Sequence, residues 1–310
     1  MDSISLQLAH QLTGKNVLLV GAGAVAITRL PKLLPTGCRL TVIAPEIEPE
    51  VWEHFDKTSS EELQDYIDED WTADKHKIYR IINRGFENTD LVLYGDGSSS
   101  QSDKDAFLSS TDPNYSFTPS VNKGWHMVLT CIPDPKLSER IFYGAKLVLG
   151  QQVMCNVADN PPLCDYYFGS NVTLGGFSRN DSQSRRSREK PIQILISSNG
   201  NSPRFTALLK QEIQRKFKSL PIGLSVARLG DLRAAIRKSS EEKCPTDFTK
   251  AQLLKFRMDW IRKCTDAFGI DYCYRINVEK TTRLFEQMLQ EKRLDLPPRE
   301  VLLEDYLDKP

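Results

Sequence analysis

The sequence has few histidines and no clustered cysteines, and this scarcity limits the metal chemistry open to the chain. Its 4 histidines and 7 cysteines are scattered along 310 residues. No two cysteines have the Cys-x-x-Cys spacing of structural zinc sites, and their odd number does not suit a disulfide framework. We therefore expect reduced thiols that mostly fill the core. A metal handled by this chain is expected to be a transient substrate rather than a caged cofactor.

The sequence also lacks a long apolar run and an excess of charge of either sign. No stretch approaches the roughly 20 apolar residues of a membrane-spanning helix, and residues 1–12 lack the basic and apolar regions of a secretory signal. The 41 basic and 41 acidic residues cancel, so no global field attracts nucleic acid or an anionic membrane. We expect a soluble, cytoplasmic protein with no nucleic-acid partner and no membrane partner.

What the sequence does contain, near its start, is the pattern of a dinucleotide-binding unit. The apolar run 16–20 is followed by Gly21, Gly23 and Ala26 in the spacing G-x-G-x-x-G/A, and a second apolar run occupies 39–43. Two glycines permit a tight turn and close approach to a pyrophosphate, and the small third residue lets the helix pack on the strand. This predicts a Rossmann-type parallel sheet; a tight turn with only a structural role is the alternative.

Two further residue types refine this prediction. Pro31 falls inside the crossover segment between the two strands, so we expect the helix there to bend or to end early. After the second strand come Ala44, Pro45 and Glu46, which places the carboxylate slightly later than the usual ribose-binding position. No arginine stands there to accept the 2′-phosphate of NADP, and this favours NAD as the cofactor.

Asp159 follows a second strand–helix–strand pattern, predicted over 126–132, 135–149 and 152–157. Ligands of open parallel sheets bind outside the carboxyl ends of the strands, so Asp159 is expected at the cofactor crevice. A lone aspartate after a strand is often only a helix cap or a turn former, and this alternative stays open. The turn 160–162 (NPP) modestly favours a fixed, exposed carboxylate.

The second half of the chain changes character. Two polar stretches, 95–120 and 178–190, are typical of surface insertions. From residue 203 onward, the spacing of apolar residues predicts an all-helical module. The loop that leads into it contains Ser198, Gly200 and Arg204, and its small residues, backbone N–H groups and cation predict an anion site. An ordinary cap and loop is the alternative.

A local excess of positive charge follows that loop. Residues 203–238 hold nine basic side chains against the two acidic side chains Glu212 and Asp231. A polycarboxylate ligand would suit this charge, whereas nucleic acid would call for interleaved aromatic residues or a known binding motif, which are missing.

Several blocks together resemble the fungal bifunctional precorrin-2 dehydrogenases and sirohydrochlorin ferrochelatases of siroheme synthesis. The resemblance covers nearly the whole chain apart from the two polar stretches, and it is carried by GKNVLLVGAGAV, RLPKLLPTGCRLTVIAP, LTCIPDP, NVADNPPLCDYYFG, ILISSNGNSPRF, RMDWIRKCTDAFGI and LPPRE. It implies NAD-dependent oxidation of precorrin-2, an eight-carboxylate tetrapyrrole, followed by insertion of ferrous iron as a substrate. A dehydrogenase without chelatase activity and a non-enzymatic NAD sensor are the alternatives.

The resemblance also assigns roles to residues. It implies that Asp159 is needed for both reactions, that Ser198 lines the tetrapyrrole site, and that the backbone of Ala24, Val25, Ala44 and Pro45 lies along the cofactor. A histidine that the yeast member carries near the turn 269–274 is absent here, which argues against a histidine-based iron site at that turn. The methyltransferase domain of bacterial siroheme synthases is also absent, so another enzyme must supply precorrin-2.

The resemblance implies a homodimer built from three parts. We expect an NAD-binding Rossmann domain over 1–150, a central α/β dimerisation and active-site segment over 151–202, and an all-helical tetrapyrrole-binding domain over 203–310.

Overall fold

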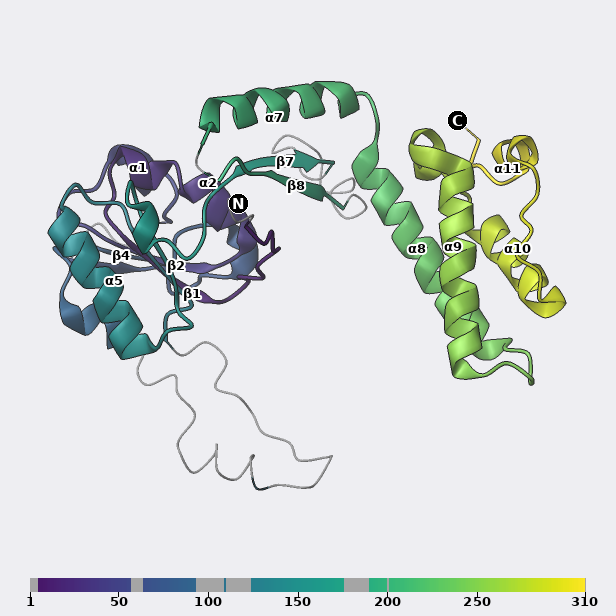
Figure 1. Cartoon of the computed structure of the whole chain (residues 1–310), viewed down its shortest axis with the longest axis horizontal. Helices are drawn as coiled ribbons and strands as arrows, with labels where there is room; N and C mark the ends of the chain where they lie inside the picture. The colour runs from purple at the N-terminus through teal and green to yellow at the C-terminus, as the bar shows by residue number, and fades with distance from the viewer. Residues whose placement is uncertain are drawn as a thin grey trace. The chain divides into compact units, whose positions relative to one another are not determined.

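The chain divides into two compact units, Ser5–Tyr167 and Phe168–Pro310 (Figure 1). The computed structural model describes residues 5–56, 64–92, 109, 124–175, 190–199 and 201–309. Most of the two polar stretches expected to be surface insertions therefore lies outside the described residues. We had expected the first domain to end at residue 150. The first unit instead continues to Tyr167, because a strand beyond residue 150 joins its sheet; the three-part functional division stays a prediction.

The first unit is built on one six-stranded sheet with the order β3-β4-β2-β1-β5-β6. Every neighbouring pair is parallel except β3 with β4, which is antiparallel and lies at one edge. The strands are β1 (Asn16–Val20), β2 (Arg39–Ile43), β3 (Asp65–Ile67), β4 (Arg80–Ile82), β5 (Met127–Thr130) and β6 (Met154–Val157). The central strands β1, β2 and β5 are mostly apolar and buried, because both faces of a parallel sheet are covered. The predicted Rossmann-type sheet is confirmed.

Helical segments connect the strands, and all of them except α5 are short. They are α1 (Ala24–Ile27), α2 (Leu30–Leu33), η1 (Leu34–Thr36), α3 (Pro49–Trp52), η2 (Ala73–Lys75), η3 (Asn88–Val92), α5 (Pro135–Leu149) and η4 (Pro161–Leu163). Helix α5 covers one face of the sheet, where its Ile141 and Ala145 share a buried cluster with Leu18 and Val128. The crossover after β1 is broken into α1 and α2, and Pro31 lies in the first turn of α2. The early helix end expected near this proline is confirmed.

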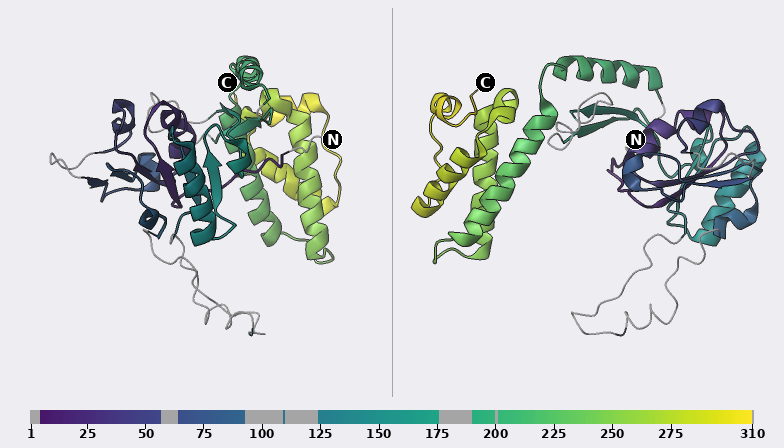
Figure 2. Two further views of the ribbon diagram at one scale, coloured as in Figure 1. Left: turned by 60° about the vertical axis from the view of Figure 1, so that its left-hand side comes forward. Right: turned by 180° about the vertical axis from the view of Figure 1, so that it is seen from behind.

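The second unit begins with an antiparallel hairpin and continues as helices (Figure 2). Its elements are β7 (Ser170–Leu174), β8 (Ile192–Ile196), α7 (Pro203–Phe217), α8 (Ile222–Glu242), α9 (Lys250–Tyr272), η5 (Cys273–Arg275), α10 (Val278–Glu291) and α11 (Arg299–Asp305). Helices α8 to α11 enclose a core around Trp260, Phe268 and Phe285, where the rings of Trp260 and Phe285 meet edge to face at 5.3 Å. The helical carboxyl-terminal module is confirmed.

Two expectations about the whole chain can be compared with these units. Within the described parts of the chain, no helix is long and apolar enough to cross a membrane. The cytoplasmic location stays a prediction. Five of the seven cysteines are buried, which confirms that the thiols mostly fill the core: Cys38, Cys131, Cys155, Cys264 and Cys273.

Candidate functional site

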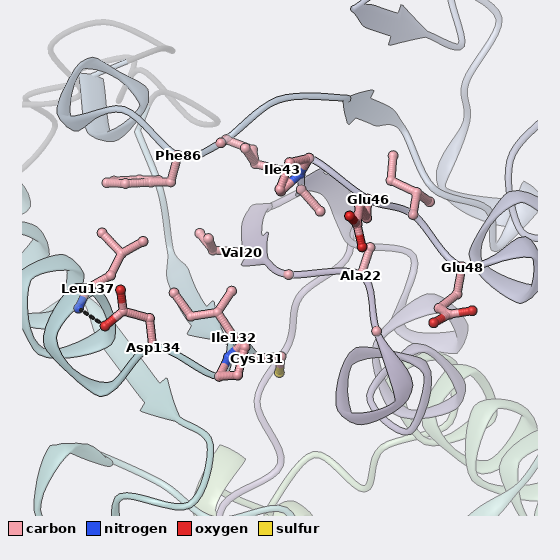
Figure 3. Close-up of a pocket in the computed structure, with 17 residues that line it drawn as sticks. Val20, Ala22, Ile43, Glu46, Glu48, Phe86, Cys131, Ile132, Asp134 and Leu137 are labelled. Atoms are coloured by element: carbon pink, nitrogen blue, oxygen red, sulfur yellow. Dashed lines mark hydrogen bonds between the residues drawn. The ribbon is translucent and has the colours of Figure 1, made fainter.

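The carboxyl ends of β1, β2 and β5 surround a cavity of about 680 Å³ (Figure 3). From β1 the chain crosses to β2 on one side, and β5 later pairs with β1 on the other side. This reversal of strand order is the point where open α/β sheets bind their ligands. The walls come from 20–23, 43–48, 85–86, 131–134 and Leu137. The cavity therefore lies where the glycine pattern predicted a dinucleotide.

Gly21 is required by the fold itself. Its φ is +104°, a conformation that side chains rarely adopt, and a Cβ there would stand 2.4 Å from the carbonyl oxygen of Cys131. Its N–H donates to the carbonyl oxygen of Ile43 at 2.8 Å. Because this glycine joins the ends of three strands, its presence alone does not distinguish a structural turn from a cofactor site.

Gly23 has no such structural requirement. Its backbone is extended, with φ −89° and ψ −166°, and a Cβ built on it would meet nothing within 4 Å. Ala26, the third position of the pattern, is fully buried, as helix packing requires. The empty space at Gly23 opens on the cavity, and a ligand pyrophosphate lying close to the backbone would use it. Gly23 is thus the position that favours the cofactor interpretation.

The charges on the cavity wall are acidic. Its lining residues include Glu46, Glu48 and Asp134 but no lysine or arginine. Asp134 Oδ1 already accepts from the N–H groups of Lys136 and Leu137, at 2.9 and 3.0 Å, and so caps α5. Figure 3 shows Phe86 and Leu137 at one end of the cavity and Glu46, beside Ala22, with Glu48 at the other.

The acidic end suits one form of dinucleotide. A carboxylate after β2 can accept hydrogen bonds from ribose hydroxyls and would repel a 2′-phosphate. Glu46 is exposed on the cavity wall. The loop before it is fixed, because Asn83 Nδ2 donates to the carbonyl oxygens of Ala44 and Pro45 at 3.1 and 2.9 Å. The residues present therefore fit NAD better than NADP.

Five of the seven expected cofactor residues line the cavity, namely Gly21, Gly23, Ala44, Pro45 and Glu46. Ala24 and Val25 do not; they form the exposed first turn of α1. Their contact with the cofactor stays a prediction.

Sequence reasoning missed the wall formed by Phe86, Ile132, Pro133, Asp134 and Leu137. A signal for most of it was available, because the strand, Asp-Pro turn and helix of 127–149 place residues 131–134 at the same sheet edge as the glycines.

Asp159 is an exposed residue in the left-handed conformation, with φ +58°, two positions after β6. An aspartate tolerates this conformation better than most residues, but it still costs on the order of 1 kcal/mol. Burial raises the pKa of the Cys131 thiol, the Arg29 guanidinium opposes that effect, and the negative charge of Asp159 adds to it. Asp159 is not among the residues that line the cavity; it follows β6, which pairs with β5, the strand that leads into the wall residues 131–134.

The remaining expected residues belong to the second unit. Ser198 is half-buried, and its Oγ accepts from the N–H of Ser202 at 2.9 Å, so this hydroxyl already supports the loop before α7. Arg204 is exposed in the first turn of α7. Gly200 lies outside the described residues. The substrate-binding roles of all three stay predictions.

Part of the basic excess in 203–238 is neutralised within the second unit. Arg215 pairs with Glu212 at 2.7 Å, and Arg228 pairs with Asp308 at 2.8 Å.

No group of three or more His, Cys, Asp or Glu that could hold a metal ion occurs among the residues whose positions are described.

Three protein-family models match successive parts of the chain. The model described as putative NAD(P)-binding matches residues 8–170, which include the sheet and the cavity. The models for the central and carboxyl-terminal parts of sirohaem biosynthesis proteins match 189–216 and 221–294.

The sequences of individual siroheme biosynthesis proteins give the same result. The chain is 39% identical to a siroheme biosynthesis protein of Saccharomyces cerevisiae, over 97% of this chain and 98% of that protein. It is 27% identical to a siroheme biosynthesis protein of Schizosaccharomyces pombe, over 92% and 77% of the two chains. A siroheme synthase of Nitrosococcus oceani is 24% identical over 77% of this chain and 35% of its own length. A solved structure of SirC, precorrin-2 dehydrogenase, aligns over 93% of this chain and 100% of that chain, with 16% identity and a TM-score of 0.47.

Proposed function

The chain belongs to the family of siroheme biosynthesis proteins, and from this premise we propose that it is a bifunctional enzyme. It oxidises precorrin-2 to sirohydrochlorin with NAD and then inserts ferrous iron to give siroheme. The observation that carries this proposal is the position of Asp159 just beyond β6, beside the end of β5, from which the cavity-wall residues 131–134 continue: Thr130 pairs with Val157, and the N–H of Ala158 donates to the carbonyl oxygen of Thr130 at 2.9 Å. This position supports a role for one base in both reactions.

In the first reaction precorrin-2 loses two hydrogens, one as a hydride and one as a proton. NAD, when bound, supplies the hydride acceptor. The open space at Gly23 would accommodate the pyrophosphate, and the Glu46 carboxylate would accept hydrogen bonds from the ribose hydroxyls. Asp159 takes the proton, so that the charge separated by hydride loss does not accumulate on the macrocycle.

In the second reaction ferrous iron is a substrate. Two pyrrole N–H protons leave the sirohydrochlorin ring as the ion enters, and Asp159 accepts them in turn and passes them to solvent, to which it is exposed. The basic residues of 203–238, Arg204 among them, bind carboxylates of the tetrapyrrole, and Ser198 and Gly200 contribute from the loop that precedes this segment. This reaction needs no NAD.

The test of bifunctionality separates the two reactions. Purified protein is given sirohydrochlorin and ferrous iron without NAD under anaerobic conditions, and siroheme formation is followed by its absorbance. We expect a rate clearly above the spontaneous one and proportional to protein concentration. A rate equal to the spontaneous one would leave a precorrin-2 dehydrogenase without chelatase activity.

We also propose that the active form is a homodimer. Helix α7 leaves large apolar side chains exposed. Only Thr206 is buried among its 15 residues, and the side chains of Phe205, Leu208 and Leu209 are 59%, 42% and 39% exposed. Helix α7 packs on the two-stranded hairpin of β7 and β8, and such a hairpin has little stability by itself. A second copy of this chain would cover these apolar side chains.

Sedimentation equilibrium tests the dimer. The double variant Phe205→Ser, Leu208→Ser should shift the mass towards that of a monomer. Leu147→Ser on α5 is the matched control, because this leucine is 85% exposed and lies outside the proposed interface. A monomeric wild-type protein, or a double variant that stays dimeric, would contradict the proposed interface.

A further inference from the structure

The segment after β6 folds back along the strand that precedes it. A bridge pairs Asn156 with Cys164, and the N–H of Asp165 donates to the carbonyl oxygen of Cys155 at 2.9 Å. The turn of this fold-back contains Asp159 and the short helix η4. Asp159 is thus at the tip of a narrow loop whose two arms contact each other.

The base of this loop is anchored to the body of the first unit. Asp165 Oδ2 accepts from the N–H of Cys155 at 2.7 Å and from Lys146 Nζ at 2.6 Å. Lys146 Nζ also donates to the carbonyl oxygen of Val153 at 2.6 Å. Asn156 Nδ2 donates to the carbonyl oxygen of Tyr166 at 2.9 Å. These contacts fix both arms but do not reach the tip.

The side chain of Cys164 connects the base to the tip. Its thiol lies 3.2 Å from the carbonyl oxygen of Val157 and 3.4 Å from that of Asn160, in donating geometry, and it receives Asn156 Nδ2 at 3.4 Å. The two carbonyls belong to residues on either side of Asp159. Burial raises the pKa of the Cys164 thiol, which keeps the S–H proton available as a donor at neutral pH.

We propose that Cys164 is a positioning residue that holds the Asp159 carboxylate in place for both reactions. The proposal rests on the catalytic role of Asp159 in the proposed function. A residue in the left-handed conformation relaxes readily to other backbone conformations unless its surroundings hold it. The Cys164 thiol gives this support through its single S–H proton, which is shared between the carbonyl oxygens of Val157, two residues before Asp159, and Asn160, the residue after it. Without this contact the loop keeps its base anchors and two backbone hydrogen bonds near the tip, from Ala158 N–H to the carbonyl oxygen of Thr130 at 2.9 Å and from Asn160 N–H to that of Val157 at 3.3 Å, but it loses the side-chain contact that joins the tip to the second arm.

The experiment compares two substitutions of Cys164 that have nearly equal volume but differ in whether the side chain can donate a hydrogen bond. Cys164→Ala removes the donor, and Cys164→Ser keeps one. We expect Cys164→Ala to lower kcat for precorrin-2 oxidation and for iron insertion by about fivefold to tenfold, the effect of one lost hydrogen bond, with KM for NAD unchanged. Cys164→Ser should restore kcat to within about twofold of wild type, because its hydroxyl can donate to the same carbonyls. Cys38→Ala, at a buried thiol before β2, should leave both rates unchanged.

A double-mutant cycle separates positioning from a general structural effect. Adding Cys164→Ala to Asp159→Asn should cause no further loss, because the carboxylate that the thiol positions is already absent. Three results would overturn the inference. They are an equal loss of kcat on adding Cys164→Ala to wild type and to Asp159→Asn, a Cys164→Ala protein with wild-type kcat, and a Cys164→Ser protein with no higher kcat than Cys164→Ala. Full activity of Asp159→Asn alone would overturn the proposed function, and this inference with it. Unfolding midpoints of all variants identify any loss that comes from a failure to fold.

Discussion

Gly21 lies directly against the backbone of Cys131, so that a Cβ on this glycine would stand 2.4 Å from the Cys131 carbonyl oxygen. The two residues follow β1 and β5, the strands between which the sheet reverses its order. Both residues line the cavity, as does Gly23, two residues later, where a Cβ would meet nothing within 4 Å. The two glycines of one motif therefore have separable roles.

Gly21→Ala should destabilise the first unit, because its φ of +104° and the Cys131 carbonyl both oppose a side chain. We expect a loss of about 2 kcal/mol or more in the free energy of unfolding. Gly23→Ala is the matched control and should unfold at the wild-type midpoint. Chemical denaturation of both variants measures the difference; equal stabilities would contradict the structural role of Gly21.

Gly23→Asp should abolish NAD binding and precorrin-2 oxidation while leaving chelation largely intact. The new carboxylate would project into the space at Gly23 and repel the pyrophosphate, but the protein has room to fold around it. Calorimetric NAD titration and the two activity assays measure the effect. Loss of chelation in a folded Gly23→Asp protein would show that the two reactions do not separate at the cofactor.

Glu46→Gln should weaken NAD binding by roughly tenfold, because a charged acceptor for the ribose hydroxyls is replaced by a neutral one. Binding of NADP should weaken less, since the repulsion of its 2′-phosphate is also removed. Glu48→Gln provides the comparison, because Glu48 lines the same end of the cavity. Equal dissociation constants for NAD in wild type and Glu46→Gln would exclude Glu46 as the ribose-binding residue.

His126 should make stability depend on pH. Burial lowers the pKa of its imidazole below the ordinary 6.5, and the charges of Lys15 and His10 lower it further. As pH falls below 6.5 the unfolded chain takes up a proton before the folded one does, so stability present above that pH is lost. The unfolding midpoint should therefore fall between about pH 7 and pH 5, with a smaller slope in His126→Gln. An unchanged slope in the variant would contradict this assignment.

Much of the fold followed from local sequence patterns. The strands at Asn16–Val20 and Arg39–Ile43 and the helix Pro135–Leu149 have the predicted bounds, because apolar runs, glycines and an Asp-Pro cap determine them within a few residues. The sequence pattern did not predict that β3 is an antiparallel edge strand, because the direction of β3 depends on its pairing with β4. The cavity wall at residues 131–134 was missed for a related reason: strand order is a non-local property.

The candidate site shows the same limit. Gly21 and Gly23 were assigned one shared role from one motif, and their separate roles depend on the distant Cys131. The position of Asp159 after β6 followed from the sequence pattern. Its left-handed backbone and the contact of the Cys164 thiol with its loop could not be predicted, because both depend on how residues 160–166 fold back along β6. For Ser198 and Arg204, a bound ligand rather than local structure decides the role.

The most direct test of the central claim is the activity of Asp159→Asn in both reactions. Asparagine has the same shape and tolerates the left-handed conformation at φ +58°, so the loop should keep its fold while losing the base. We predict that precorrin-2 oxidation with NAD and iron insertion without NAD both slow by at least about a hundredfold, while NAD binding is unchanged. Retention of the wild-type rate in either reaction would contradict the assignment of one carboxylate to both.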